Sequence, residues 1–169
     1  MAEVVKHYSS YVHVLYTCGG YLEPDSMEYG REYDNDYVLC ECELEPLAGL
    51  VGELEKKHPV TIVKEPSVCL TMIRTEDSLE KQEFYLGEAL TTECEVSVAG
   101  AAGYGVCLGE EPLRGYCLAV VDALLQQGTE TSVIETFLGQ HRGLISQREQ
   151  EEFNLVLRTQ VDFKLMEEE

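Results

Sequence analysis

Positive charge is scarce in this 169-residue chain, which has 12 Lys and Arg against 32 Asp and Glu and a formal net charge of −20. Proteins that bind nucleic acid or anionic membranes depend largely on Lys and Arg to neutralise phosphate. Both are therefore poor partners for this chain, and basic proteins, cations or other subunits are better ones. The acidic residues are spread along the whole sequence, so no single acidic tail accounts for the charge.

Long apolar runs and paired cysteines are also missing. No segment approaches the ~18 to 20 apolar residues of a membrane span, and the first residues lack a charged start followed by an uninterrupted apolar run. The seven cysteines form no CxxC pair, and several fall in apolar phases of predicted elements. That pattern is typical of buried thiols in a reducing compartment, so we expect a cytoplasmic protein without metal ligands or disulfides.

The length fits one domain with an extension before it. We expect residues 1–36 to be a tyrosine-rich acidic N-terminal extension and residues 37–169 to form a single domain. Within the extension only Val12, Val14 and Tyr16 fit a strand. We expect deletion of residues 1–36 to leave a cooperative unfolding transition.

The clearest pattern lies in residues 84–127. Up to Val98, apolar residues recur at every second position, which predicts a half-buried antiparallel strand. The residues on its apolar side are Phe84, Leu86, Leu90, Cys94, Val96 and Val98. Glu88 falls in this phase directly after Gly87, which favours a bulge at the glycine over an inward carboxylate. A reversal over Gly100 to Gly105 and a short strand over 104–108 are expected next.

A helix follows, because the apolar period changes from 2 to 3.6. Pro112 suits its first turn, Glu110 and Glu111 suit the positive end of its dipole, and Gly128 suits the position after its last turn. Its apolar stripe consists of Leu113, Tyr116, Cys117, Val120, Val121, Leu124 and Leu125.

The remaining elements complete an α+β prediction. Residues 37–44 read as a strand, and a helix opens at Glu45-Pro46 and closes at His58-Pro59. VTIVKEP and SVCLTMIRT are two neighbouring strands or one interrupted strand. Thr129 caps a third helix, and the alternation in residues 154–166 predicts a last strand. The expected fold is a mostly antiparallel sheet of about five or six strands with three helices packed on one face.

A glycine-rich run between a strand and a helix raises the possibility of a phosphate-binding loop. The order of Gly100, Gly103, Gly105 and Gly109 fits neither common phosphate-loop motif, and no lysine is present. Glu110 and Glu111 would repel a phosphate. A hairpin reversal and a strand end are the better interpretation.

Other candidate chemistry is equally sparse. Cys40 and Cys42 supply two thiols, but no nearby pair completes a zinc site, so we interpret them as strand cysteines. Glu93 and Glu95 could form an acid and base pair, although exposed strand carboxylates are the plainer interpretation. The remaining candidates are Asp34 and Asp36, too few for a calcium loop, and the scattered histidines His7, His13, His58 and His141. We predict no catalytic, cofactor-binding or metal-binding residue in this chain.

Several stretches resemble a known family. The segments are EPSVCLTMI, FYLGEALTTECEVSVAG, GYGVCLGEEP, AVVDALL and TQVDFKLM, in order from about Tyr37 to Met166. They resemble PhnG, the G subunit of the bacterial carbon-phosphorus lyase system, which degrades phosphonates.

The resemblance implies a subunit that works in a complex. Its partners would be the H, I and J subunits, with L and K, and paired copies of the chain are expected in the complex. With the H, I and L subunits it would help make alpha-D-ribose 1-methylphosphonate 5-triphosphate from ATP and a phosphonate. A radical iron-sulfur subunit then cleaves the carbon-phosphorus bond. The chemistry is attributed mainly to the I subunit, so the resemblance places no catalytic residue here, and ATP is a substrate of the complex.

Two positions depart from the family pattern. Glu76 stands roughly where the family usually has arginine, and Cys69 stands where it has glycine. A changed partner or anion contact would follow. The alternatives are a non-enzymatic scaffold that kept the fold, and a stand-alone enzyme that acts on a cationic or metal-bound substrate through Glu88, Glu93 and Glu95.

Overall fold

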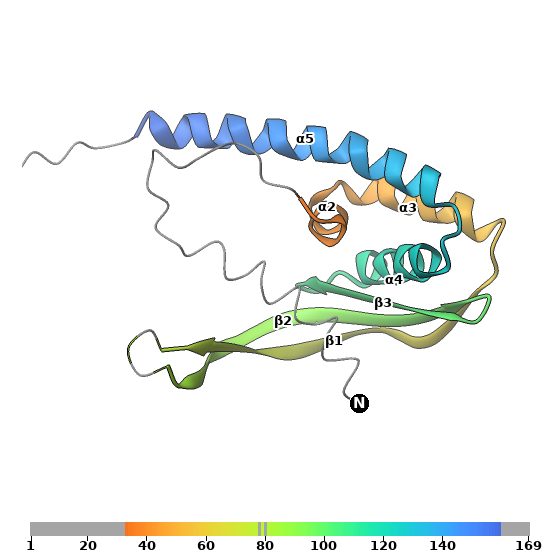
Figure 1. Ribbon diagram of the computed structural model, residues 1–169, viewed down its shortest axis with the longest axis horizontal. Coiled ribbons are helices and arrows are strands. Elements are labelled where there is room, and N and C mark those ends of the chain that lie inside the picture. Colours follow the sequence, from red (N-terminus) through yellow and green to blue (C-terminus); the bar gives the residue numbers. More distant parts are fainter. Residues whose placement is uncertain (1–32, 78, 80, 160–169) are drawn as a thin grey trace, which may run out of the picture.

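Residues 33–77, 79 and 81–159 are described by the computed structural model, and they form an α+β fold. Four helices lie on one side of an antiparallel sheet with strand order β1-β2-β3 (Figure 1). The predicted fold class is therefore confirmed. The expected five or six strands are too many, because the described residues form three. The strand suggested for residues 12–16 lies outside them.

Strands β2 (Glu83–Val98) and β3 (Ala101–Leu108) form a tight hairpin. Val98 pairs with Ala101, so the loop consists of Ala99 and Gly100, both with positive φ, at 46° and 92°. Two-residue loops with positive φ match the twist of antiparallel strands. The reversal is thus shorter than predicted, and Gly103 and Gly105 belong to β3.

Strand β1 (Val60–Glu76) confirms the interrupted-strand alternative. It pairs with β2 along its whole length, with register shifts on both sides of Lys64. Pro66 has no N–H to donate, which suits an edge strand with an irregular ladder.

A further register shift lies beside Gly87, where the bulge was predicted. Ile73 pairs with Gly87 and Arg74 with Tyr85, so Leu86 has no partner. The shift precedes Glu88, which keeps the phase of Thr92 and is exposed nonetheless. The reason is that α4 covers this face of the sheet only as far as Thr92.

Helices α3 (Leu44–Glu55) and α4 (Pro112–Gln127) agree with the sequence prediction. Pro112 occupies the first turn of α4, and Gly128 ends it in the left-handed conformation with φ 67°. The N–H of Thr129 donates to the carbonyl of Leu124 at 3.0 Å. Glycine after the last turn adopts this conformation without the usual steric cost.

Two strand predictions are wrong. Residues 37–41 belong to the short helix α2 (Asn35–Glu41), where the Asp34 side chain accepts from the N–H of Tyr37 at 2.7 Å. A side-chain cap of this kind favours a helix start. Residues 154–157 belong to α5 (Thr131–Leu157), whose N-cap is Glu130 and not the predicted Thr129. The remainder of that predicted strand, from residue 160, lies outside the described residues.

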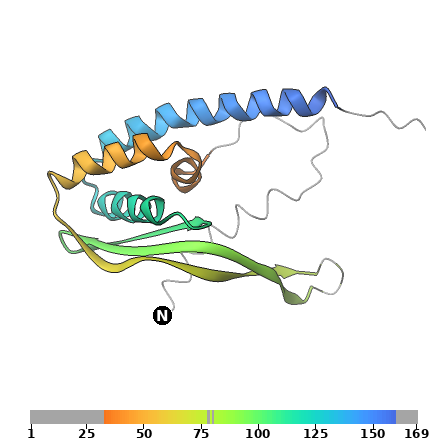
Figure 2. The same ribbon diagram turned by 180° about the vertical axis from the view of Figure 1, so that it is seen from behind.

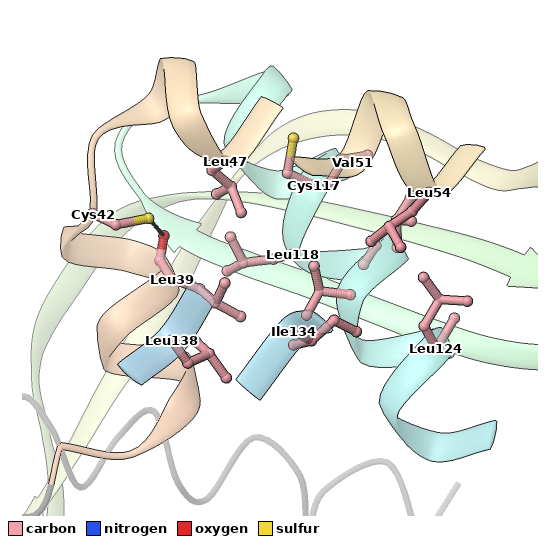
Figure 3. Close-up of a cluster of buried hydrophobic side chains, with 14 of the residues drawn as sticks. Leu39, Cys42, Leu47, Val51, Leu54, Cys117, Leu118, Leu124, Ile134 and Leu138 are labelled. Carbon is pink, nitrogen blue, oxygen red and sulfur yellow. Dashed lines mark hydrogen bonds between the residues drawn. The ribbon is translucent and has the colours of Figure 1, made fainter. Parts of the chain in front are cut away.

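The helices form two layers over the sheet. α4 packs on the strands, and α2, α3 and α5 lie on the side of α4 that faces away from the sheet (Figures 1 and 2). The side chains in the centre of the core come from α2, α3, α4 and α5 (Figure 3). They include Leu39, Leu47, Leu54, Leu118, Leu124, Ile134 and Leu138. Because α4 is covered from both sides, Ala119 and Ala123 are buried as well as Cys117, Val120, Val121 and Leu124 of its predicted stripe, whereas Leu113 at its start is exposed.

The last residues of the predicted extension contact this core. The hydroxyls of Tyr33 and Tyr37 donate to the two oxygens of Glu149, at 2.6 and 2.5 Å. Arg142 of α5 donates to the carbonyl of Tyr33 and to the Oδ1 of Asn35. Residues 33–36 therefore pack against α5.

Because of these contacts, deletion of residues 1–32 is the sharper test of the extension. We expect the shortened chain to keep one cooperative thermal transition with a melting temperature close to that of the full chain. Deletion of residues 1–36, which also removes the Asp34 cap and the Tyr33 contact, is expected to cost more, about 1 to 2 kcal/mol. Aggregation of the chain that lacks only 1–32 would show that the extension is part of the core.

Candidate functional surface

The glycine-rich run is explained by close packing of α4 on β3. A Cβ at Gly105 would lie 2.6 Å from the backbone nitrogen of Ala119, and closer still to the carbonyl oxygen of Gly115. A Cβ at Gly103 would lie 2.6 Å from the backbone nitrogen of Ala123. These glycines let a helix backbone rest on a strand backbone.

The residues just before α4 also use backbone amides within the fold. The N–H of Glu111 donates to the Oγ1 of Thr92 at 3.0 Å, and that hydroxyl donates to the carbonyl of Gly109 at 2.7 Å. The N–H of Gly109 donates to the carbonyl of Leu90. The geometry of the run therefore serves packing, as the hairpin interpretation expects, with tighter contacts than the sequence indicated.

The cysteines are mostly interior thiols. Cys42, Cys94, Cys107 and Cys117 are buried, and burial raises the pKa of Cys107 and Cys117 to about 11. At neutral pH these groups stay protonated, which disfavours nucleophilic or metal-ligand roles. Cys40 and Cys42 lie at the end of α2 and not on a strand, so their predicted placement was wrong. Among the described residues no cluster of potential metal ligands is found.

The two described histidines have structural neighbours. His141 is buried on α5 against the ring of Phe137, with ring centroids 4.2 Å apart. His58 lies 3.4 Å from a carboxylate oxygen of Glu130, which also pairs with Lys57. His7 and His13 lie outside the described residues. Asp34 caps α2, and Asp36 lies in its first turn.

The three carboxylates of the hypothetical acidic site do not share a face. Residues 88–93 pair with β1 without a register break, so side chains alternate between the two faces along this stretch. Glu93 and Glu95 point to the open face, whereas Glu88 has the phase of the helix-covered face. Glu93 pairs with Lys64, and Glu95 raises the pKa of neighbouring Tyr104. The fold therefore separates the groups that such an enzyme would need together.

Both departures from the family pattern lie on β1. Cys69 lies on the open face, where its sulfur is 3.2 Å from the Oγ1 of Thr91. Thr71 contacts the same oxygen at 2.8 Å. Glu76 is the last residue of β1, and its backbone pairs with that of Glu83.

The most prominent surface is one that the sequence did not reveal. Residues 70–76 and 83–90 pair only with each other, because β3 pairs with β2 from Thr91 onward. This two-stranded extension, here called the ribbon, projects beyond α4 (Figure 1). Its exposed large apolar side chains, counted with the adjoining Val68, are Val68, Leu70, Met72, Phe84, Tyr85, Leu86 and Leu90.

Concentrated apolar exposure of this kind marks surfaces that bind other proteins. Phe84, Leu86 and Leu90 were expected to be buried, and they are exposed because no helix reaches them. The one signal in the sequence was Glu88. This residue interrupts the alternation of apolar residues in β2 at the point where α4 no longer covers the sheet.

The model of the family described as phosphonate metabolism protein PhnG matches residues 36–167. The chain belongs to this family. A search of curated proteins finds no match. The PhnG match begins in α2, includes every described strand and helix after it, and covers the whole ribbon. Membership makes the chain a protein of phosphonate metabolism.

No helix among the described residues combines the length and apolar character needed to cross a lipid bilayer.

Proposed function

We propose that this PhnG chain is a non-catalytic subunit of the carbon-phosphorus lyase complex. It acts in the cytoplasm with the H, I and L subunits to make alpha-D-ribose 1-methylphosphonate 5-triphosphate from ATP and a phosphonate. Its contribution is to bind other subunits, namely H, I and J with L and K, in a complex that contains paired copies of the chain.

The observation that carries the proposal is the exposed apolar ribbon within the region matched by the family. A two-stranded ribbon without a third strand or a helix over it is marginal in water, so its exposed apolar side chains favour a bound partner. The net charge of −20 supports partners with basic surfaces, because complementary charge speeds association and selects partners.

The side-chain geometry gives little support to a stand-alone enzyme. Glu88 lies on the opposite face from Glu93 and Glu95, and the N–H of Glu111 at the start of α4 donates to Thr92 within the fold. Tight binding of a triphosphate usually needs several Lys or Arg donors together with backbone amides. Glu110 and Glu111 stand at the only such entry that the sequence suggested.

Two measurements test the proposal. Calorimetry of ATP against the isolated chain is expected to show no micromolar binding, because Asp and Glu side chains far outnumber the Lys and Arg side chains that could bind phosphate. Co-expression with the H, I and J subunits from the same genome is expected to yield a complex that contains this chain. Micromolar ATP affinity without partners would favour a self-contained enzyme, and failure to co-purify would favour a scaffold with another client.

A further inference from the structure

One edge of the sheet has no neighbouring strand among the described residues. β1 is an edge strand of the described sheet, since the strand order is β1-β2-β3. The opposite edge is partly occupied, because the N–H of Tyr104 in β3 donates to the Oδ2 of Asp122 in α4 at 2.8 Å. Exposed edges present a row of backbone donors and acceptors to any strand that approaches. The two edges therefore differ in their readiness to pair.

The two halves of β1 differ in the same way. The first half contains Lys64, Glu65 and Pro66 together with two register shifts. Charges, proline and irregular pairing hinder the addition of another strand to an edge. The stretch Ser67–Ile73 reads SVCLTMI, with no charge and no proline. Its pairing with β2 runs without a register break. This regular stretch is suited to accept another strand.

The side chains beside this edge are apolar and uncovered. Leu70 is 63% exposed and Met72 is 52% exposed. Their register with Leu90 and Glu88 places all four on the face that α4 covers farther along the sheet. A strand added beside β1 would extend this face of the sheet. Every second side chain of the added strand would then lie on this face and pack beside Leu70 and Met72.

Charge argues against a second copy of the chain as the occupant. Two chains would bring together two net charges of −20, and Glu65 and Glu88 are exposed next to the edge and its apolar face. Charge–charge interactions stay effective over ~8 to 10 Å at physiological salt, which is about two strand spacings, so carboxylates on β1 and β2 would act on a strand added beside β1. Lys or Arg on the incoming strand would be attracted.

We infer that the edge Ser67–Ile73 of β1 accepts an extended segment of another subunit as a fourth strand. The segment has alternating apolar residues that cover Leu70 and Met72, and Lys or Arg residues that face the ribbon carboxylates. This inference rests on the proposed function, because it names the surface by which the chain joins its complex.

Matched substitutions test the surface. Leu70→Arg and Met72→Arg are each expected to lower the yield of complex with co-expressed H, I and J subunits by about tenfold, since buried apolar contacts become charged. Leu144→Arg is the control, because Leu144 is 60% exposed on α5, away from the ribbon. The control is expected to assemble like the unmodified chain. All three substitutions are at exposed positions, and thermal melting of each isolated variant checks that it folds.

Hydrogen exchange distinguishes strand addition from contact with the ribbon face alone. In the complex, alternate amides of Ser67–Ile73 are expected to exchange at least about tenfold more slowly than in the isolated chain, because they donate to the new strand. Unchanged exchange there would overturn strand addition even if Leu70→Arg weakens assembly. Equal assembly of all variants would overturn it as well.

The same experiments separate this inference from the proposed function. If the unmodified chain fails to assemble with the H, I and J subunits, the proposed function fails, and this inference fails with it. If it assembles and the ribbon variants do too, only the inference fails. Sedimentation of the isolated chain is expected to show a monomer, and a dimer with protected Ser67–Ile73 amides would identify a second copy as the occupant and overturn the inference.

Discussion

Replacement of Gly105 by alanine is expected to destabilise the protein by about 3 kcal/mol or to prevent folding. The added Cβ would lie 2.6 Å from the backbone nitrogen of Ala119 and closer to the carbonyl oxygen of Gly115. Both are atoms of the α4 backbone, which cannot swing aside as a flexible side chain does. The helix would have to move away from β3 as a unit. Urea denaturation followed by circular dichroism measures the loss.

Gly139→Ala is the control for this substitution. Gly139 lies inside α5, and no atom from another part of the fold lies within 4 Å of an added Cβ. Alanine there is expected to stabilise the chain by up to about 1 kcal/mol, because it has the higher helix propensity. A Gly105→Ala chain that unfolds within about 0.5 kcal/mol of the unmodified protein would show that α4 does not rest on β3 in this way.

Leu124→Ala is expected to cost about 2 to 5 kcal/mol, as large-to-small changes in a well-packed core do. Leu124 is 0% exposed and lies among side chains from α3, α4 and α5 (Figure 3). Truncation removes apolar contacts and leaves a cavity that the two helix layers cannot close without moving. The shift of the urea denaturation midpoint measures this loss, provided that the dependence of the unfolding free energy on urea concentration is the same for both chains.

Leu113→Ala tests whether the loss of stability comes from the burial of Leu124 and not from the replacement of any leucine in α4. Leu113 lies on the same helix and in the same predicted apolar stripe, but it is 48% exposed. Its truncation is expected to change stability by less than about 1 kcal/mol. Equal losses at both positions would mean that the stripe is buried along its whole length, as the sequence alone suggested. A loss below about 0.5 kcal/mol at Leu124 would contradict its burial.

The sequence predicted the elements whose local signals agree with one another. For α4, the 3.6 period, Pro112 at the start and Gly128 at the end all indicate the same helix, and its bounds are those of the structure. For α3, the closing His58-Pro59 pair and the Leu47, Val51 spacing do the same. In the second half of β2, the alternation of Cys94, Val96 and Val98 correctly gave the buried face.

The sequence failed where two periods fit a short stretch equally well. Over residues 37–44 the apolar residues alternate, yet Val38, Leu39 and Cys42 also have helical spacing. Tertiary contacts decide in favour of α2. The two carbonyls near its end, those of Leu39 and Cys42, each accept from Arg114 of α4 at 2.9 Å. Arg148 of α5 donates to the side chain of Glu41. None of these partners is close in sequence.

By itself the sequence determined the fold class, the central helix and the PhnG family, because period, capping and family motifs are properties of consecutive residues. Only the tertiary structure decided which apolar residues are buried. Val98 and Leu90 share the phase of one strand, but α4 covers the first and stops short of the second. How far a helix extends over a sheet depends on packing between segments distant in the chain. The exposed ribbon, and with it the candidate functional surface, is therefore a property of the assembled fold.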